Sequence, residues 1–140
     1  MSVHALNAYQ SIDTASRCGT ADKRELVVMM YDAALESIRL ARVHAGQSES
    51  RKASAQVSRA MSVVSGLRET LDLARGGSVA SHLNDFYCFI LGRLMASSGA
   101  QRVDALTECE DLLSQVREAW TVISPGTVGH VNRHLFLVRT

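Results

Sequence analysis

The sequence predicts an all-α protein, an antiparallel up-down four-helix bundle. Apolar residues recur at alternating steps of three and four along four long stretches, which places them on one face of a helix in each stretch. Short polar or glycine-containing segments separate the stretches, and short connections place successive helices side by side. No strand pattern competes. We expect helices over about 23–45, 51–74, 79–97 and 102–123, and a tail over 125–140.

The first expected helix begins after a capping box. Asp22 and Glu25 stand three residues apart, an arrangement in which each side chain accepts a hydrogen bond from a backbone N–H of the first turn. Gly46 is a suitable end for this helix, because glycine readily adopts the conformation that closes a helix. The polar loop that follows offers Ser48 or Ser50 as the next cap. The apolar face comprises Val27, Met30, Tyr31, Ala34, Ile38 and Ala41.

The second and third expected helices form a hairpin around Gly76 and Gly77. Either glycine can take the left-handed conformation that reverses the chain, because it has no Cβ, and Ser78 can cap the helix that follows. Further helices must cover the apolar faces of both. The face of the second helix comprises Val57, Ala60, Met61, Val64, Leu67 and Leu71. The face of the third comprises Val79, Leu83, Phe86, Ile90 and Leu94.

The fourth expected helix begins by about Arg102 and ends before Pro125. Acidic residues gather in its first half, where the helix dipole favours them. The tail beyond it contains an apolar run, Leu135–Val138, which is compatible with a short C-terminal helix, an arm or a disordered end. The apolar face of this helix comprises Val103, Leu106, Cys109, Leu112, Leu113, Val116, Ala119, Trp120 and Ile123.

The composition limits the classes of function. A chain of 140 residues with 46% hydrophobic residues and one proline is expected to form a single domain, residues 1–140, with one core. The formal net charge is +1 and the basic residues are scattered, so nothing favours nucleic-acid binding. Charges interrupt every apolar run before the roughly 20 residues of a membrane span, and the N-terminus lacks a secretory signal pattern. We therefore expect a cytoplasmic protein without a membrane span.

Chemical motifs are missing from the sequence. The three cysteines, Cys18, Cys88 and Cys109, stand at wide spacings that predict reduced thiols, and Cys88 lies beside an apolar face, where a thiol is usually inert packing. A partial nucleophile elbow at Ser78 lacks its last glycine and a preceding strand. Phosphate loops, dinucleotide fingerprints and the Glu-x-x-His pairs of di-iron bundles do not occur. We expect no catalytic residue, no cofactor and no metal.

Several short pieces follow one another in a specific order: Asn7-Ala8-Tyr9-Gln10, Glu25-Leu26-Val27, Tyr31-Asp32-Ala33-Ala34-Leu35, Leu67-Arg68-Glu69-Thr70-Leu71-Asp72, Gly76-Gly77, Phe86-Tyr87, Arg93-Leu94, and Leu112-Leu113 through Arg117-Glu118-Ala119-Trp120. Together they resemble the flagellin export chaperone family, FliS, over nearly the whole chain to about Trp120. The chain departs from the family's pattern at Lys23, Ala33 and Cys88-Phe89, where a proline, a glycine, and a polar residue followed by a tyrosine are usual.

The resemblance implies a cytoplasmic chaperone of flagellar type III export that lacks ATPase activity. Such a protein binds the disordered C-terminal segment of flagellin, prevents its premature polymerisation and assists its delivery for export. An anti-sigma factor and export-gate components are compatible with the resemblance as further partners. It also suggests that the segment from Asn7 to Ile12 lies over the groove that binds the partner and yields when flagellin arrives.

The residues alone favour the same kind of function. A bundle without catalytic motif, cofactor motif or charged patch acts through its surface, and helical proteins commonly bind an amphipathic segment in a groove between helices. The main alternative is a regulatory bundle that binds another cytosolic helix, such as an anti-sigma factor. A third class, a metal-dependent enzyme, lacks its ligands.

The expected partner-binding residues lie in two regions. Tyr9 and Ile12 gain about 1.5 to 3 kcal/mol each when fully buried, so the N-terminal segment is expected to dock, either as ordinary core or as a removable cover. The central hairpin offers more apolar surface than four helices must bury. The expected residues are Asn7, Ala8, Tyr9, Gln10, Ile12, Val64, Leu67, Leu71, Leu83 and Tyr87.

Overall fold

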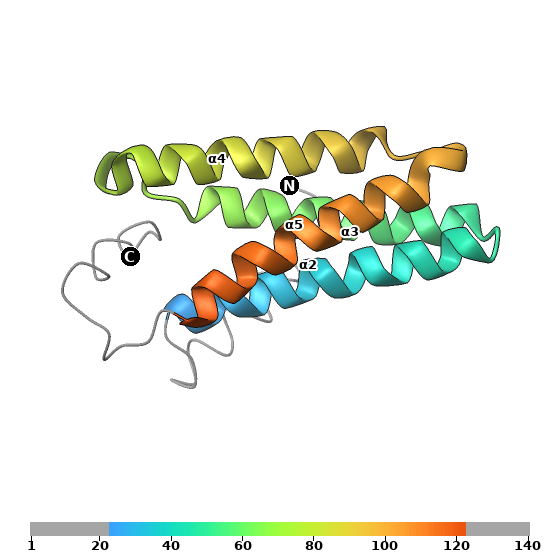
Figure 1. The fold of residues 1–140 in the computed structure, drawn as a ribbon, viewed down its shortest axis with the longest axis horizontal. Coiled ribbons are helices and arrows are strands. Elements are labelled where there is room, and N and C mark those ends of the chain that lie inside the picture. Colours follow the sequence, from blue (N-terminus) through green and yellow to red (C-terminus); the bar gives the residue numbers. More distant parts are fainter. Residues whose placement is uncertain (1–22, 123–140) are drawn as a thin grey trace.

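The computed structural model describes residues 23–122, and four antiparallel α-helices make up this part of the chain (Figure 1). The predicted fold class is therefore confirmed. The expected N-terminal capping segment and the possible short C-terminal helix lie outside the described residues. The elements are α2, Lys23–Gly46; α3, Ser50–Glu69; α4, Leu73–Ala96; a short 3-10 helix, η1, Gly99–Gln101; and α5, Arg102–Val122.

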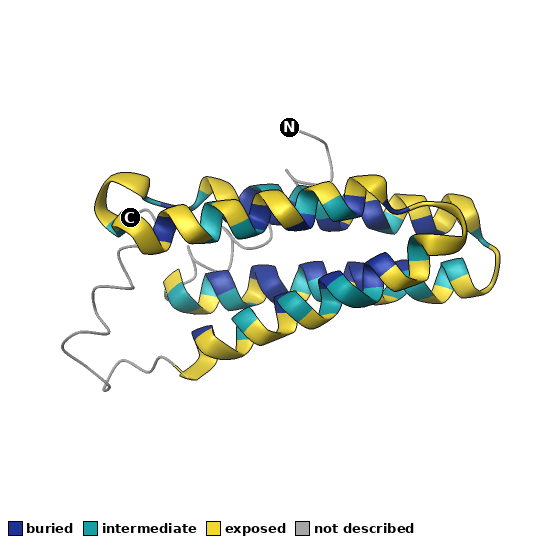
Figure 2. Ribbon diagram, turned by 45° about the horizontal axis from the view of Figure 1, so that its top comes forward, coloured by how far each residue is buried: buried dark blue, intermediate teal, exposed yellow. Residues whose placement is uncertain are grey.

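The helices form a ring in which each has two neighbours. α2 packs along α3 and α5, α3 also packs on α4, and α4 meets α5. The contact between α2 and α3 is the most extensive, and the contact between α4 and α5 is the sparsest of these four. In both Figure 1 and Figure 2, α4 and α5 lie close where η1 joins them and separate toward their other ends.

The predicted apolar faces meet in the core, where buried residues line the inner sides of the helices (Figure 2). All six residues of the first predicted face are buried. In the second face only Met61 is not fully buried. The faces of α4 and α5 are covered less completely, since Val79, Val103 and Ala119 are exposed. The buried residues of α4 are Ala80, Tyr87, Ile90 and Leu94.

The turn between α3 and α4 comes earlier than predicted, at residues 70–72. The Thr70 hydroxyl donates to the Leu67 carbonyl over 2.6 Å, and the Asp72 carboxylate accepts the Arg75 N–H over 3.1 Å. Asp72 begins α4 by accepting one of the N–H groups that a helix start leaves without a partner. The Thr70 hydroxyl adds a second donor to the Leu67 carbonyl, which also accepts the Thr70 N–H at the end of α3. The predicted end near residue 74 is therefore wrong.

Two residues explain why the pattern hides this turn. Leu71 is buried within the turn itself, so the apolar spacing continues through the break. Gly77 has φ +56°, the positive φ expected of a glycine here, and it separates a first helical turn at residues 73–76 from the long run of α4 that follows. The spacing of apolar residues indicates which residues are buried. A buried residue in a turn therefore looks, in the sequence, like one more residue of the helix.

The α2–α3 connection confirms one prediction and corrects another. α2 ends at Gly46 as predicted. Neither serine caps α3, because Glu49 occupies the N-cap position and Ser48 adopts φ +60°. The Glu49 carboxylate instead contacts Lys52 at 2.9 Å and His44 at 3.2 Å. The contact to Lys52, and then that to His44, lower the pKa of the Glu49 carboxyl. The cap predicted before α2, Asp22, lies outside the described residues.

The kink at Gly77 generates a stability prediction. An alanine at this position has space around its Cβ but must hold a positive φ, which L residues rarely adopt. We expect Gly77→Ala to lower the free energy of unfolding by about 1 to 3 kcal/mol. The matched control is Gly92→Ala in the same helix, where space is also open and φ is ordinary. It is expected to be neutral or to stabilise by up to about 1 kcal/mol. Urea unfolding measures both, and equal stability of the two variants would contradict a strained kink.

Candidate functional site

Two buried tyrosines join helices that are not neighbours in the ring. The hydroxyls of Tyr31 in α2 and Tyr87 in α4 lie 2.6 Å apart, and their ring centroids are 6.2 Å apart. Burial raises the pKa of Tyr87 to about 12 and that of Tyr31 further still, where Tyr87 adds to the rise and Trp120 opposes it. Both phenols are therefore neutral near pH 7. One hydroxyl donates to the other, so each has a hydrogen-bond partner in an apolar interior.

Ion pairs fasten α5 to α2. Arg117 of α5 makes a two-point contact with the Asp32 carboxylate of α2. Arg42 of α2 lies 3.2 Å from Glu110 of α5, and both side chains are about three-quarters buried or slightly less. These two contacts lie about two helical turns apart along α5, so they hold that part of the helix against α2.

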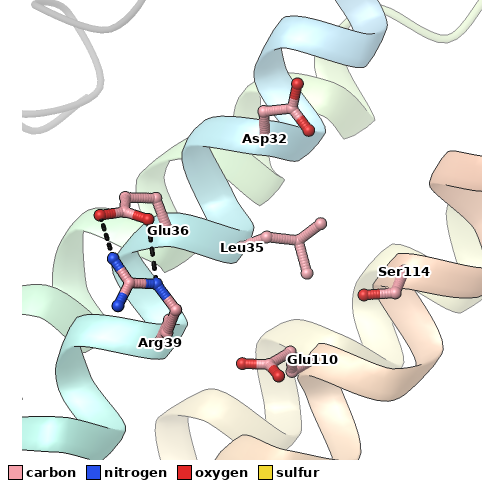
Figure 3. Close-up of a pocket in the computed structure, with 6 residues that line it drawn as sticks. All are labelled: Asp32, Leu35, Glu36, Arg39, Glu110 and Ser114. Atoms are coloured by element: carbon pink, nitrogen blue, oxygen red, sulfur yellow. Dashed lines mark hydrogen bonds and ion pairs between the residues drawn. The ribbon is translucent and has the colours of Figure 1, made fainter.

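A hollow of about 350 Å³ lies between α2 and α5 (Figure 3). Leu35 points into the space between the helices, and the Glu36 carboxylate binds Arg39 of its own helix. The other two carboxylates of the hollow pair with Arg117 and Arg42. Its charges are therefore matched within the protein. The residues that line it are Asp32, Leu35, Glu36, Arg39, Glu110 and Ser114.

One ion pair identifies the sides of α4 and α5 that face each other. Arg93 of α4 contacts Glu108 of α5 at 2.8 Å, close to η1. Steps of three and four back from Arg93, and forward from Glu108, give the residues on the same sides of the two antiparallel helices. Most of them are apolar, whereas His82, Asp85 and Asp111 are polar. We call the six large apolar residues that are exposed or partly buried the α4–α5 face: Val79, Leu83, Phe86, Phe89, Leu112 and Val116.

The α4–α5 face is incompletely covered. Phe89 is 47% exposed and Val79 is 37% exposed. The other four residues are partly buried and pack against the core. The reason lies in the ion pairs, because α5 is held along α2 while its ion pair to α4 lies close to η1. An apolar strip between diverging helices can accept an amphipathic segment.

The opposite side of α4 points toward α3. Asn84 accepts a hydrogen bond from Arg68 of α3 over 2.8 Å, and Met95 lies on the same side of α4, three helical turns further on. Met95 is 73% exposed. It thus offers an exposed apolar residue on α4 that is outside the α4–α5 face.

The predicted partner-binding residues divide into three groups. Asn7, Ala8, Tyr9, Gln10 and Ile12 lie outside the described residues. Leu83 is partly buried and belongs to the α4–α5 face. Four are buried and pack in the core, with at most 2% of each exposed: Val64, Leu67, Leu71 and Tyr87. The assignment of all ten residues to partner binding stays a prediction.

Sequence reasoning did not single out most of the α4–α5 face. It places Val79, Phe86, Leu112 and Val116 among ordinary core residues, and it leaves Phe89 off the face of the third helix. The signal for Phe89 is a large apolar side chain on the polar side of an amphipathic pattern. No such signal exists for the other four, because their spacing is that of a core face.

The cysteines in the described range are both free thiols. Cys109 is buried, and burial raises its pKa to about 11, with a further rise from Glu108. Cys88 is exposed, so its expected role as inert packing is wrong: it lies on the solvent side of α4. Within residues 23–122, no group of three His, Cys, Asp or Glu side chains is placed to hold a metal ion.

None of the helices in the described part of the chain is both long enough and apolar enough to span a bilayer.

Comparisons with known proteins point to one family. The family model described as "Flagellar protein FliS" matches residues 5–127. The flagellar secretion chaperone FliS of Salmonella typhimurium is 30% identical over 121 residues, which cover 86% of this chain and 90% of that protein. FliSB of Pseudomonas aeruginosa, also a flagellar secretion chaperone, is 27% identical over 120 residues, which cover 86% of this chain and 95% of that protein. FliS of Escherichia coli is 25% identical, with 86% of this chain and 91% of that protein covered.

The tyrosine pair generates a prediction about coupling. Tyr31→Phe and Tyr87→Phe each leave one buried hydroxyl without its partner, so each is expected to cost about 1 to 3 kcal/mol of stability. The double variant removes both hydroxyls and is expected to cost clearly less than the sum. Urea unfolding of the four proteins measures the coupling energy. Strictly additive losses would show that the two hydroxyls do not depend on each other.

The same pair predicts the effect of alkaline pH. A tyrosine ionises near pH 10 in the unfolded chain, whereas burial raises the pKa of Tyr31 and Tyr87 in the folded protein. The unfolded state therefore loses these protons first, and the stability that they contribute is full below about pH 10 and falls as pH rises above it. We expect the free energy of unfolding to fall less steeply between pH 10 and 11 in the double phenylalanine variant. An identical fall would rule out a contribution from the pair.

Proposed function

The chain belongs to the FliS family of flagellar secretion chaperones, and from this premise we propose that it binds the disordered C-terminal segment of flagellin. In this proposal the binding takes place in the cytoplasm, prevents premature polymerisation of flagellin and assists its delivery for export. The protein acts by covering apolar residues of its cargo and not by catalysis.

The observation that supports the proposal is the α4–α5 face. It presents exposed Phe89 and Val79 beside four partly buried apolar residues of the same two helices. A segment that folds into an amphipathic helix can lay its apolar side along such a strip. Residues of the cargo that would drive polymerisation are then withdrawn from water.

The energetics suit a cargo that must be released. Complete burial of a large apolar side chain contributes about 1.5 to 3 kcal/mol, and the cost of ordering the disordered segment opposes this gain. Only one residue in three or four of a bound helix faces the chaperone. Net affinity therefore depends on a few side chains. Removing one of them is expected to have a measurable effect.

Other partners are less well supported. The relatives are named as flagellar secretion chaperones. The anti-sigma factor and the export-gate components therefore stay predictions of the resemblance, and no contact among the described residues favours either of them.

Calorimetric titration with a peptide of the flagellin C-terminal segment tests the proposed face. Phe89→Ser removes an exposed side chain, so we expect the fold to persist and the affinity to fall about tenfold, equivalent to about 1.4 kcal/mol. The matched control is Met95→Ser, which changes an even more exposed apolar residue on the other side of α4 and is expected to bind like the unaltered protein.

A third variant tests the predicted groove. Val64 is completely buried, so Val64→Lys is expected to lower the melting temperature sharply through an unpaired buried charge. Two outcomes would move the binding site away from the α4–α5 face: unchanged affinity of Phe89→Ser, or a Val64→Lys protein that stays folded and no longer binds the peptide.

A further inference from the structure

Acidic side chains border the α4–α5 face on α5. Asp111 and Glu118 are both exposed and stand seven residues apart, which is about two helical turns or roughly 10.5 Å along one side of the helix. Both lie beside the face, because the part of α5 between them contains Leu112 and Val116. Asp111 makes no hydrogen bond or ion pair with a described residue, and Glu118 acts on Arg117 only through space.

The border of the face on α4 also carries a negatively charged side chain. Asp85 is exposed, stands one helical turn from Phe89, and has no hydrogen bond or ion pair to any described residue. The carboxylates of the border are thus Asp85 on α4 and Asp111 and Glu118 on α5, and the exposed His82 lies about one helical turn from Asp85 on α4.

The basic side chains of these helices do not neutralise that border. α4 and α5 contain no lysine, and their four arginines all bind elsewhere. Arg93 pairs with Glu108, and Arg75 lies 3.8 Å from Asp72. Arg117 binds Asp32 of α2. The remaining one, Arg102, donates to the Ser97 carbonyl.

We propose that the segment that docks on the α4–α5 face is an amphipathic helix with lysine or arginine residues flanking its apolar stripe. The inference rests on the proposed function, because it takes the α4–α5 face as the docking surface. Acidic residues at seven-residue spacing match basic residues at the same spacing on a helix that packs alongside, as the flanking charges do in coiled coils. Helices with acidic flanks are repelled, so the border selects among apolar segments.

Two designed helical peptides test this inference. They share one leucine stripe and differ only in their flanks, which carry lysine in one peptide and glutamate in the other. We expect the protein to bind the lysine peptide at least tenfold more tightly in low salt, and the difference to shrink as salt screens the charges. In the triple variant Asp85→Asn, Asp111→Asn, Glu118→Gln, the two affinities are expected to agree within about twofold.

Asp104→Asn is the matched control. It lies seven residues before Asp111 on the same side of α5, but beyond the Arg93–Glu108 pair that closes the face, so the selection is expected to persist. Equal binding of both peptides to the unaltered protein, or binding of neither, overturns the inference. If both bind equally and Phe89→Ser weakens both, only the inference about charge fails, and the docking surface of the proposed function is retained.

Discussion

The position of α4 depends on the hydrogen bond between Tyr31 and Tyr87. α4 buries fewer residues than the other helices and has the sparsest contact with α5, so apolar packing alone restrains it weakly. A hydroxyl left without a partner in the core costs about 1 to 3 kcal/mol, which opposes any rotation or sliding of α4 that separates the two phenols. The hydrogen bond therefore holds α4 to α2 through the core, while the side of α4 that carries Phe89 and Val79 stays exposed.

The ion pairs of α5 complete this arrangement. Exposed pairs add little stability, but both pairs of α5 with α2 lie where the two helices pack. Asp32 and Arg117 connect α5 to α2, and the two residues come from sequence pieces that carry the resemblance to FliS. Tyr31 and Tyr87 come from two such pieces as well. Residues of the family pattern that are distant in the sequence thus meet where they position the α4–α5 face.

The sequence predicts the fold class and the core face of α2 because apolar periodicity directly reports one-sided burial. It misplaces the α3–α4 turn because Leu71 is buried within it. It does not reveal the α4–α5 face, since Phe86 and Val116 have core spacing and their exposure depends on which neighbour α5 follows. That choice is made by contacts between residues far apart in the chain, such as Asp32 and Arg117, and no local pattern encodes it.

Site-specific photocrosslinking tests the central claim, that the flagellin segment lies between α4 and α5. Benzoylphenylalanine replaces Phe89 or Val116 on the face in two proteins, and Met95 on the other side of α4 in a third. Each protein is irradiated with the flagellin C-terminal segment, and the crosslinked product is quantified by mass spectrometry. The account predicts strong crosslinks from the first two positions and little from Met95. Crosslinking from Met95 alone, with none from Phe89 or Val116, would contradict it.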